Sequence, residues 1–398
     1  MKLHVLPIKL ITLIVAAFVI VFFGFKYFLS TNIYLQQRID SCRTKKDQLC
    51  YRDLIMDQFK KQGLDSSLKL VARIFAADPT FSTSCHDVGH LLGSETYKLF
   101  KGGKSFKVSP EIAFCSYGFY HGFMELMAGE GDVSKARDFC KYVDNQMSKV
   151  TPDASLQCFH GIGHGWVNIH GDTSLVGDDL GITNRGLALC EKVSANDSEL
   201  SRCATGVFNG IAIFYGTGEY SLKMRTSDPM WLCRSVDSKF QDPCYISMNT
   251  VLYAVSGQNL RLAASYIEQI KDDTIATHAM INLALPFSFA ESSKSDHSES
   301  VEVCRGLQKR LVGPCFQGFA FGILEHGEPG REYVKSIAFC KGNGLVPDET
   351  KQCLSYIYLY LPQWYPKEKA YSICDEEGEY SSFCKEKVEI GINGLTNQ

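Results

Sequence analysis

The sequence predicts an all-α protein in which an N-terminal transmembrane anchor is followed by a solenoid or toroid of disulfide-stapled helical hairpins. The first observation is an uncharged apolar run near the N-terminus, and the second is a set of 16 cysteines that fall mostly into short-range pairs. The third is a glycine-containing motif that recurs roughly every 40 residues, a period typical of repeat architectures. In such architectures each unit packs mainly on its neighbours.

The apolar run covers residues 10–25 without a charge and continues after Lys26 to Leu29. This is about the 20 residues that a helix needs to cross the hydrocarbon core of a membrane. Signal peptides are cleaved after small residues, and Phe-Leu-Ser-Thr at positions 28–31 is a poor cleavage site. We therefore expect residues 1–31 to form a short cytoplasmic tail and a signal-anchor helix, and residues 32–398 to form an extracytoplasmic, cysteine-rich helical repeat domain.

Cysteine usage predicts the compartment. Seven pairs are close in sequence: Cys42/Cys50, Cys140/Cys158, Cys190/Cys203, Cys233/Cys244, Cys304/Cys315, Cys340/Cys353 and Cys374/Cys384. Only Cys85 and Cys115 remain, and we expect them to pair with each other. Disulfides at this density persist in oxidising compartments. Positive charges flank the apolar run on both sides, so charge bias does not give its orientation. The cysteines place the body outside the cytoplasm, in a periplasmic, extracellular or lumenal space.

The repeat is visible when the second cysteines of the pairs are aligned. Cys115, Cys158, Cys203 and Cys315 each begin the motif C-x2-G-x3-G, and Cys85 begins the same motif with one residue inserted. Cys244 and Cys353 keep the position without the glycines. The gap of 71 residues between Cys244 and Cys315 has room for an additional unit without cysteines.

Each unit has the pattern of a helical hairpin. The first helix ends near the first cysteine, a polar connector follows, and an apolar second helix begins near the second cysteine. Glycines four residues apart share one helix face and let neighbouring backbones approach closely, which offsets a helix-propensity cost of about 1 kcal/mol each. We therefore predict that CFHGIGHGW (158–166) is the start of a packed inner helix and not a loop. The predicted inner helices begin near Cys85, Cys115, Cys158, Cys203, Cys244, Cys315 and Cys353.

Over residues 42–390, the paired cysteines and helical hairpins resemble disulfide-stapled helical-repeat proteins of the Sel1-like and tetratricopeptide-like kind. The resemblance is one of architecture and implies a helical solenoid. The spacing of 10–18 residues in most cysteine pairs is wider than the Sel1-like pattern, and the Leu-Gly and Tyr positions of that pattern are missing. The resemblance therefore implies no ligand and no partner.

Histidines are concentrated in the first units: six of the ten lie between residues 86 and 170. Three successive inner helices each carry an i, i+4 pair of metal-ligand types, and these positions share one helix face. The pairs are His86 with His90, His121 with Glu125, and His160 with His164. Asn209 and Phe321 occupy the His164 position in later units, so packing alone does not require a histidine there.

These pairs predict a site for one or two transition-metal ions, because imidazole suits Zn, Cu and Fe. The predicted ligands are His86, His90, His121, His160 and His164, and Glu125 is the candidate catalytic base for a metal-bound water. The alternative for each histidine is a hydrogen-bonded core or surface group without a metal.

Two functional hypotheses follow. The first is a membrane-anchored extracytoplasmic metal-binding protein, and whether it is also an enzyme stays open. The second is a non-catalytic scaffold that binds a protein or an envelope component on the solenoid surface. Nucleic-acid binding is not expected, because the net charge of −3 reflects no surplus of lysine and arginine.

Other catalytic motifs are absent: the chain contains neither H-E-x2-H nor G-x-S-x-G, and it has no C-x2-C-H for haem attachment. The aromatic stretch at residues 356–365 is interpreted as the core of a terminal repeat.

Overall fold

The computed structural model describes residues 33–104, 106, 110–113, 115, 117–128, 131, 133–147, 154–167, 173–291, 296–328 and 330–396. All regular structure in these ranges is helical, which confirms the all-α class. The predicted anchor lies outside the described residues. Among the helices that are described, none is long and apolar enough to cross a membrane.

The elements follow in order along the chain. Residues 33–45 are helical. The longer helices are α2 (Gln48–Ala77), α3 (Ser82–Lys101), α4 (Gly118–Ala128), α5 (Val133–Met147), α6 (Ala154–Trp166), α7 (Asp179–Val193), α8 (Asp197–Thr217), α13 (Asp273–Glu291), α15 (Lys309–Glu325), α17 (Pro347–Trp364) and α19 (Ser381–Thr396). The shorter ones are α9 (Trp231–Ser235), α10 (Gln241–Ser247), α11 (Asn249–Val255), α12 (Leu260–Ile267), α14 (Ser298–Arg305), α16 (Tyr333–Lys341) and α18 (Lys367–Asp375).

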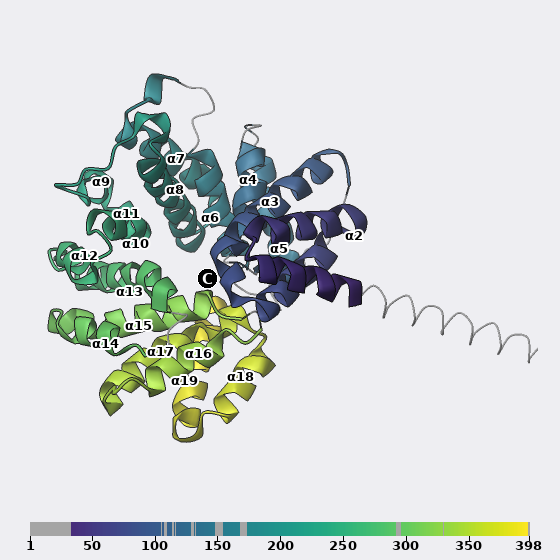
Figure 1. Ribbon diagram of the computed structural model, residues 1–398. Coiled ribbons are helices and arrows are strands. Elements are labelled where there is room, and N and C mark those ends of the chain that lie inside the picture. The colour runs from purple at the N-terminus through teal and green to yellow at the C-terminus, as the bar shows by residue number, and fades with distance from the viewer. Residues whose placement is uncertain are drawn as a thin grey trace, which may run out of the picture.

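The helices form an inner series and an outer series. In the inner series each member packs on the next: α3, α4, α6, α8, α10, α13, α15, α17 and α19. An outer helix packs on the inner helix that follows it, as α5 does on α6 and α16 does on α17. Figure 1 shows these elements following one another around a common centre. The pair α12 and α13 is the cysteine-free unit expected between Cys244 and Cys315.

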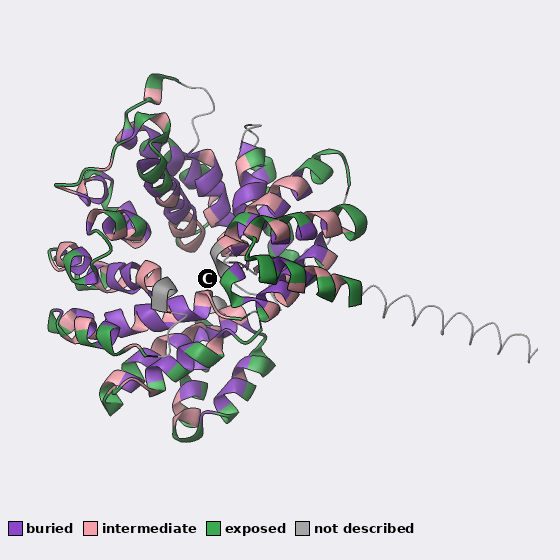
Figure 2. Ribbon diagram, in the orientation of Figure 1, coloured by how far each residue is buried: buried purple, intermediate pink, exposed green. Residues whose placement is uncertain are grey.

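Burial follows the same division. The largest fully buried side chains include Phe123, Phe159, Phe208 and Phe319, which belong to the inner helices α4, α6, α8 and α15. The outer helices keep long exposed faces, seen in green in Figure 2. The core is therefore continuous along the inner series, as expected when each unit buries its apolar surface against its neighbours.

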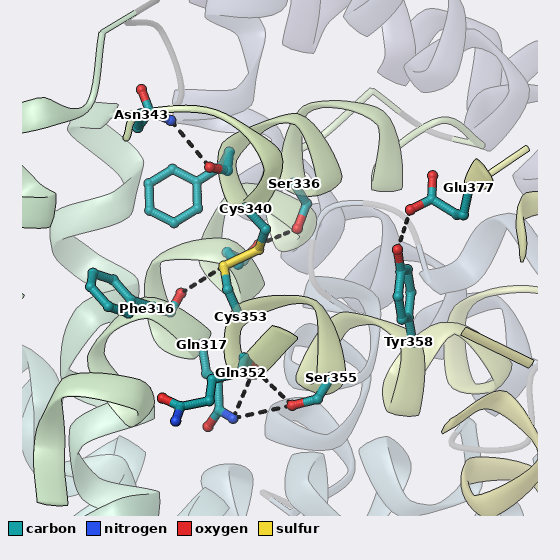
Figure 3. The surroundings of a disulfide bond; sticks show 12 residues. Phe316, Gln317, Ser336, Cys340, Asn343, Gln352, Cys353, Ser355, Tyr358 and Glu377 are labelled. Carbon is teal, nitrogen blue, oxygen red and sulfur yellow. Dashed lines mark hydrogen bonds between the residues drawn. A yellow bond between two sulfur atoms is a disulfide. The ribbon is translucent and has the colours of Figure 1, made fainter. Parts of the chain in front are cut away.

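Eight disulfides pair all the cysteines as the sequence predicts. Six of them join an outer helix to the inner helix of the same hairpin. Figure 3 shows one of these, Cys340–Cys353, between α16 and α17. The bridge Cys85–Cys115 is different, because it joins α3 to the residues just before α4 and so links two neighbouring inner helices.

The observed helix boundaries differ systematically from the expected ones. Most inner helices begin before their cysteine: α8 starts six residues before Cys203, where the side chain of Asn196 accepts a hydrogen bond from the Glu199 backbone and caps the helix. The exception is α4, which starts three residues after Cys115. Cys115 and Tyr117 have φ angles of +61° and +57°, so the chain cannot be α-helical there.

The motif glycines lie where inner helices touch. An added Cβ at Gly122 of α4 would collide with the carbonyl oxygen of His90 on α3, and one at Gly206 of α8 would collide with that of His160 on α6. The expected close approach of backbones is therefore confirmed, and it occurs beside the histidines.

Candidate metal centre

Three imidazoles from two adjacent helices converge on one point. His86 and His90 project from one face of α3, and His121 projects from α4. His90 Nε2 lies 3.1 Å from His86 Nε2 and 3.1 Å from His121 Nδ1. These three nitrogens lie within 4.8 Å of one another. Such separations are close to those of nitrogens that each bind one ion at about 2.0–2.1 Å.

A backbone contact determines which ring nitrogen of His86 carries the hydrogen. His86 Nδ1 lies 2.9 Å from the carbonyl oxygen of Cys115, which can only accept, so Nδ1 is the donor. The carbonyl is available because α4 begins after Cys115, as described above. The remaining nitrogen, Nε2, therefore carries a lone pair and faces His90.

The carboxylate of Glu125 faces Nδ1 of His90, the ring nitrogen that points away from His86. Its Oε1 lies 3.6 Å from His90 Nδ1 and 3.2 Å from His164 Nδ1. Burial alone would raise the pKa of Glu125, but its interactions with the imidazoles of His164 and His90 outweigh burial and lower the pKa to about 2. A carboxylate at Nδ1 favours the hydrogen on that atom, which leaves His90 Nε2 as a second lone pair.

The two lone pairs then face each other at 3.1 Å without a proton between them. Burial, and next the neighbouring His90, lower the pKa of His86 to about 4, so a proton is a poor bridge at neutral pH. Burial likewise lowers the pKa of His121 well below its usual value. A cation bound by all three nitrogens removes the repulsion. The donor set therefore fits a transition-metal ion.

The two histidines of α6 join the cluster but not the ligand group. The rings of His164 and His121 are stacked, with centroids 4.6 Å apart and planes 4° from parallel, and the His160 ring lies 5.0 Å from His121. Both ring nitrogens of His164 are buried, and Nε2 has no hydrogen-bond partner in the described part of the chain. The structure thus brings together all five predicted imidazoles and Glu125, while only three nitrogens converge closely.

His160 is oriented by α8. Its Nδ1 lies 2.9 Å from Thr205 Oγ1, and the Thr205 hydroxyl donates to the carbonyl of Arg202 at 2.7 Å. The hydroxyl oxygen must therefore accept from His160 Nδ1. Burial, and next the charges of His164 and Arg202, lower the pKa of His160 to about 3.

Sequence reasoning missed two contributors to the candidate site. The carbonyl of Cys115 belongs to the backbone, so no residue type in the sequence indicates its role. Thr205 follows its cysteine by two residues, as His160 does, so the repeat alignment could have identified it. The predicted loop residue His170 lies outside the described residues, and His278 pairs elsewhere with Asp242 at 3.1 Å.

No family model matches this chain, and comparisons with curated proteins and with solved structures likewise found no match.

Proposed function

We propose that the protein is a membrane-anchored, extracytoplasmic metal-binding protein whose ion is held by His86, His90 and His121. The observation that carries the proposal is the pair of opposed Nε2 lone pairs on His86 and His90, 3.1 Å apart in a partly buried setting. Three imidazole ligands leave a coordination position for water or substrate, which is the arrangement of catalytic zinc sites. The site therefore suits metal-dependent catalysis with zinc, copper or iron.

Within this proposal, Glu125 orients imidazoles. Its carboxylate faces the Nδ1 atoms of His90 and His164, away from the converging nitrogens. Carboxylates commonly hold metal-bound histidines in this way, fixing the ring and its tautomer. This position favours an orienting role over the role of general base that the sequence suggested.

The test is elemental analysis of the full-length chain, purified without chelators and reconstituted with each metal in turn. We expect about one equivalent of a transition metal in the parent protein. His90→Ala should lose it, because a two-imidazole remnant binds weakly. His278→Ala is the matched control, since that histidine also lies on an inner helix and pairs with a carboxylate. A parent protein that takes up none of the three metals would overturn the proposal.

Compartment and anchoring belong to the same proposal. Eight disulfides support an oxidising compartment, and the apolar run at residues 10–29 supports the anchor. The series of neighbour contacts supports a solenoid or toroid of Sel1-like character. We expect the full-length chain to stay in the membrane fraction after an alkaline carbonate wash. A chain that begins at residue 32 should be released, and equal behaviour of the two chains would contradict an anchor.

A scaffold is the second candidate, and one surface feature favours it. An apolar pocket of about 340 Å³ lies between α3 and α5, lined by Phe100, Phe106, Lys135, Asp138, Phe139 and Tyr142. Exposed aromatic surface of this kind is typical of protein-binding sites. Chemical cross-linking in envelope extracts would test this: Tyr142→Glu should abolish a specific cross-link while leaving the metal content unchanged.

A further inference from the structure

The connector between α7 and α8 contains the only Asn-x-Ser/Thr triplet of the chain, Asn196-Asp197-Ser198. This triplet, with any residue except proline in the middle, is the acceptor motif for N-linked glycans. In secreted proteins such motifs mark surface loops, because the attached glycan is bulky and hydrophilic. A usable acceptor therefore needs an exposed asparagine whose side-chain nitrogen is not engaged by the protein.

The structure exposes this triplet. Asn196 and Asp197 are exposed, and Ser198 is partly exposed. The connector is shaped by a short-range contact, in which the backbone N–H of Ala195 donates to the carboxylate of Glu199 at 2.6 Å. In Figure 1, α7 and α8 lie side by side, and the connector is the turn that joins them. The triplet is thus presented on a turn that is ordered by its own residues.

The two side-chain atoms of Asn196 have different environments. Its Oδ1 accepts a hydrogen bond of 2.9 Å from the backbone N–H of Glu199 and so caps α8. The atom that faces this N–H must be the oxygen, because the nitrogen of the amide can only donate. Its Nδ2 has no hydrogen-bond partner in the described part of the chain. The helix cap therefore leaves unengaged the atom to which an N-linked glycan is attached.

A cap and a glycan are compatible on the same side chain. An N-linked glycan replaces one hydrogen of Nδ2 and leaves Oδ1 as a carbonyl oxygen, which can still accept from the Glu199 N–H. The backbone of Asn196 is extended, with φ −148° and ψ 173°, so the residue lies outside the helix that it caps. Modification at this position therefore requires no change in α8.

The same hairpin carries a marker of the oxidising compartment. Cys190 and Cys203 form a disulfide with a sequence separation of 13, and the triplet lies inside the loop that this bridge closes. Disulfides form and persist outside the cytoplasm. The segment that holds Asn196 is thus flanked on both sides by cysteines that have met an oxidising environment, where asparagine-linked glycans also occur.

We propose that Asn196 carries an N-linked glycan. The inference rests on the extracytoplasmic compartment of the proposed function and not on the metal site. The glycan comes from an oligosaccharide that is linked to a lipid pyrophosphate. Nδ2 forms a bond to the anomeric carbon of the first sugar, the bond from that carbon to the pyrophosphate oxygen breaks, the lipid pyrophosphate leaves, and Nδ2 gives up one proton.

Asn259 is an internal control. It is also exposed, and its Oδ1 also caps a helix, α12, by accepting from the backbone N–H of Leu262 at 2.9 Å. The second residue after it is Arg261, so the hydroxyl of the acceptor motif is missing. The two asparagines share their local geometry and differ in the motif, and we expect only Asn196 to be modified.

The test uses the full-length protein from the membranes of its own cells, treated with a thiol-alkylating reagent before lysis. Treatment with a peptide N-glycosidase in heavy-oxygen water converts a glycosylated asparagine into aspartate that contains the heavy isotope. Peptide mass spectrometry should find this conversion at Asn196 and not at Asn259. The intact protein should also migrate faster on a gel after the treatment.

Three substitutions, made in the same cells, separate the glycan from the helix cap. Ser198→Ala keeps the capping asparagine and should abolish the gel shift completely, whereas Ser198→Thr keeps the hydroxyl and should retain it. Asn196→Asp keeps a capping oxygen, so the protein should fold with the same disulfides but lack the glycan. The bound metal should be unchanged in all three variants.

The outcomes distinguish this inference from the proposed compartment. Alkylation of the cysteines before lysis would show a reducing compartment, and the glycan would fail together with the proposed location. Intact disulfides with an unmodified Asn196, or a gel shift that persists in Ser198→Ala, would show that the glycan proposal alone is wrong.

Discussion

At the scale of single residues, the candidate metal site depends on the atoms that contact the far nitrogen of each imidazole. Cys115 and Thr205 each accept a hydrogen bond from a histidine Nδ1, and Glu125 faces a third. Each contact fixes one tautomer and leaves the opposite nitrogen as a lone pair. The cluster is thus built from ligands whose direction is set by neighbours, and one of those neighbours is a backbone carbonyl.

Glu125→Gln tests this dependence. We expect metal affinity to fall by about 10- to 100-fold, the usual effect of losing the carboxylate behind a ligand histidine. Competition with a chromogenic chelator measures the affinity. Glu95→Gln is the control, because the carboxylate of Glu95 on α3 pairs with Lys98 of the same helix. A variant that binds metal normally and loses only turnover would instead support Glu125 as a general base.

The histidines themselves could be predicted, because i, i+4 spacing on successive helices places them on facing surfaces. The sequence could not predict which of them meet: nitrogens of His86, His90 and His121 converge, whereas the rings of His160 and His164 stack on that of His121. This arrangement depends on how α6 sits against α4, and small differences in helix separation decide which nitrogens meet. Neither the stacking of His164 on His121 nor the acceptor at Cys115 leaves a signal in the sequence.

At the scale of helices, the motif glycines set the separation between neighbours. In α8 the contrast lies within one element: a Cβ at Gly206 would strike the carbonyl of His160, whereas Gly216 has nothing within 4 Å of its Cβ position. We expect Gly206→Ala to reduce the free energy of unfolding by about 1–3 kcal/mol, as overpacking usually does. Urea denaturation followed by circular dichroism measures it.

Gly216→Ala is the matched substitution in the same helix. It should be neutral or stabilise by about 0.4–1 kcal/mol, because alanine loses less conformational entropy on folding and has the higher helix propensity. Equal destabilisation by the two substitutions would mean that the glycines act through flexibility and not through close packing.

A second element-level prediction concerns pH. His278 on α13 lies 3.1 Å from both carboxylate oxygens of Asp242 on α10, and the hydrogen bond to Asp242 raises the pKa of His278 although burial opposes it. A raised pKa stabilises the fold below the unfolded value of about 6.5. That stability is lost as pH rises through the folded value.

Asp242→Asn should therefore destabilise the protein more at pH 5.5 than at pH 8.5. The side chain of His278 is 43% exposed, so solvent screens the pair and the difference should be about 0.2–1 kcal/mol. Urea denaturation at the two pH values measures it. A larger loss at the higher pH would contradict the ion pair.

At the scale of the whole molecule, the order of hairpins could be predicted because each cysteine pair is local and closes one unit. The cysteine-free unit around α13 followed from spacing alone. How far the inner helices curve around the centre could not be predicted, because the curvature accumulates from many small packing angles along the series.

Because each hairpin packs mainly on its neighbours, we expect the loss of one disulfide to affect mainly the adjoining helices. The bridge Cys85–Cys115 closes a loop of 30 residues and adjoins both His86 and its acceptor carbonyl. The bridge Cys374–Cys384 closes one of 10 residues in the last hairpin. In the chain-entropy model they contribute about 3–4 and about 3 kcal/mol respectively. Double serine substitution should therefore destabilise the two variants to a similar extent.

Their effects on the metal should differ. Without Cys85–Cys115, the start of α4 is no longer tied to α3, so the Cys115 carbonyl can move away from His86 and metal affinity should fall at least about tenfold. Without Cys374–Cys384, the affinity should match that of the parent protein, because the last hairpin contacts mainly its own neighbours. Chelator competition and urea denaturation on the same samples give both quantities. Equal loss of metal in the two variants would show that the helices act as one cooperative body, in which the site depends on every hairpin.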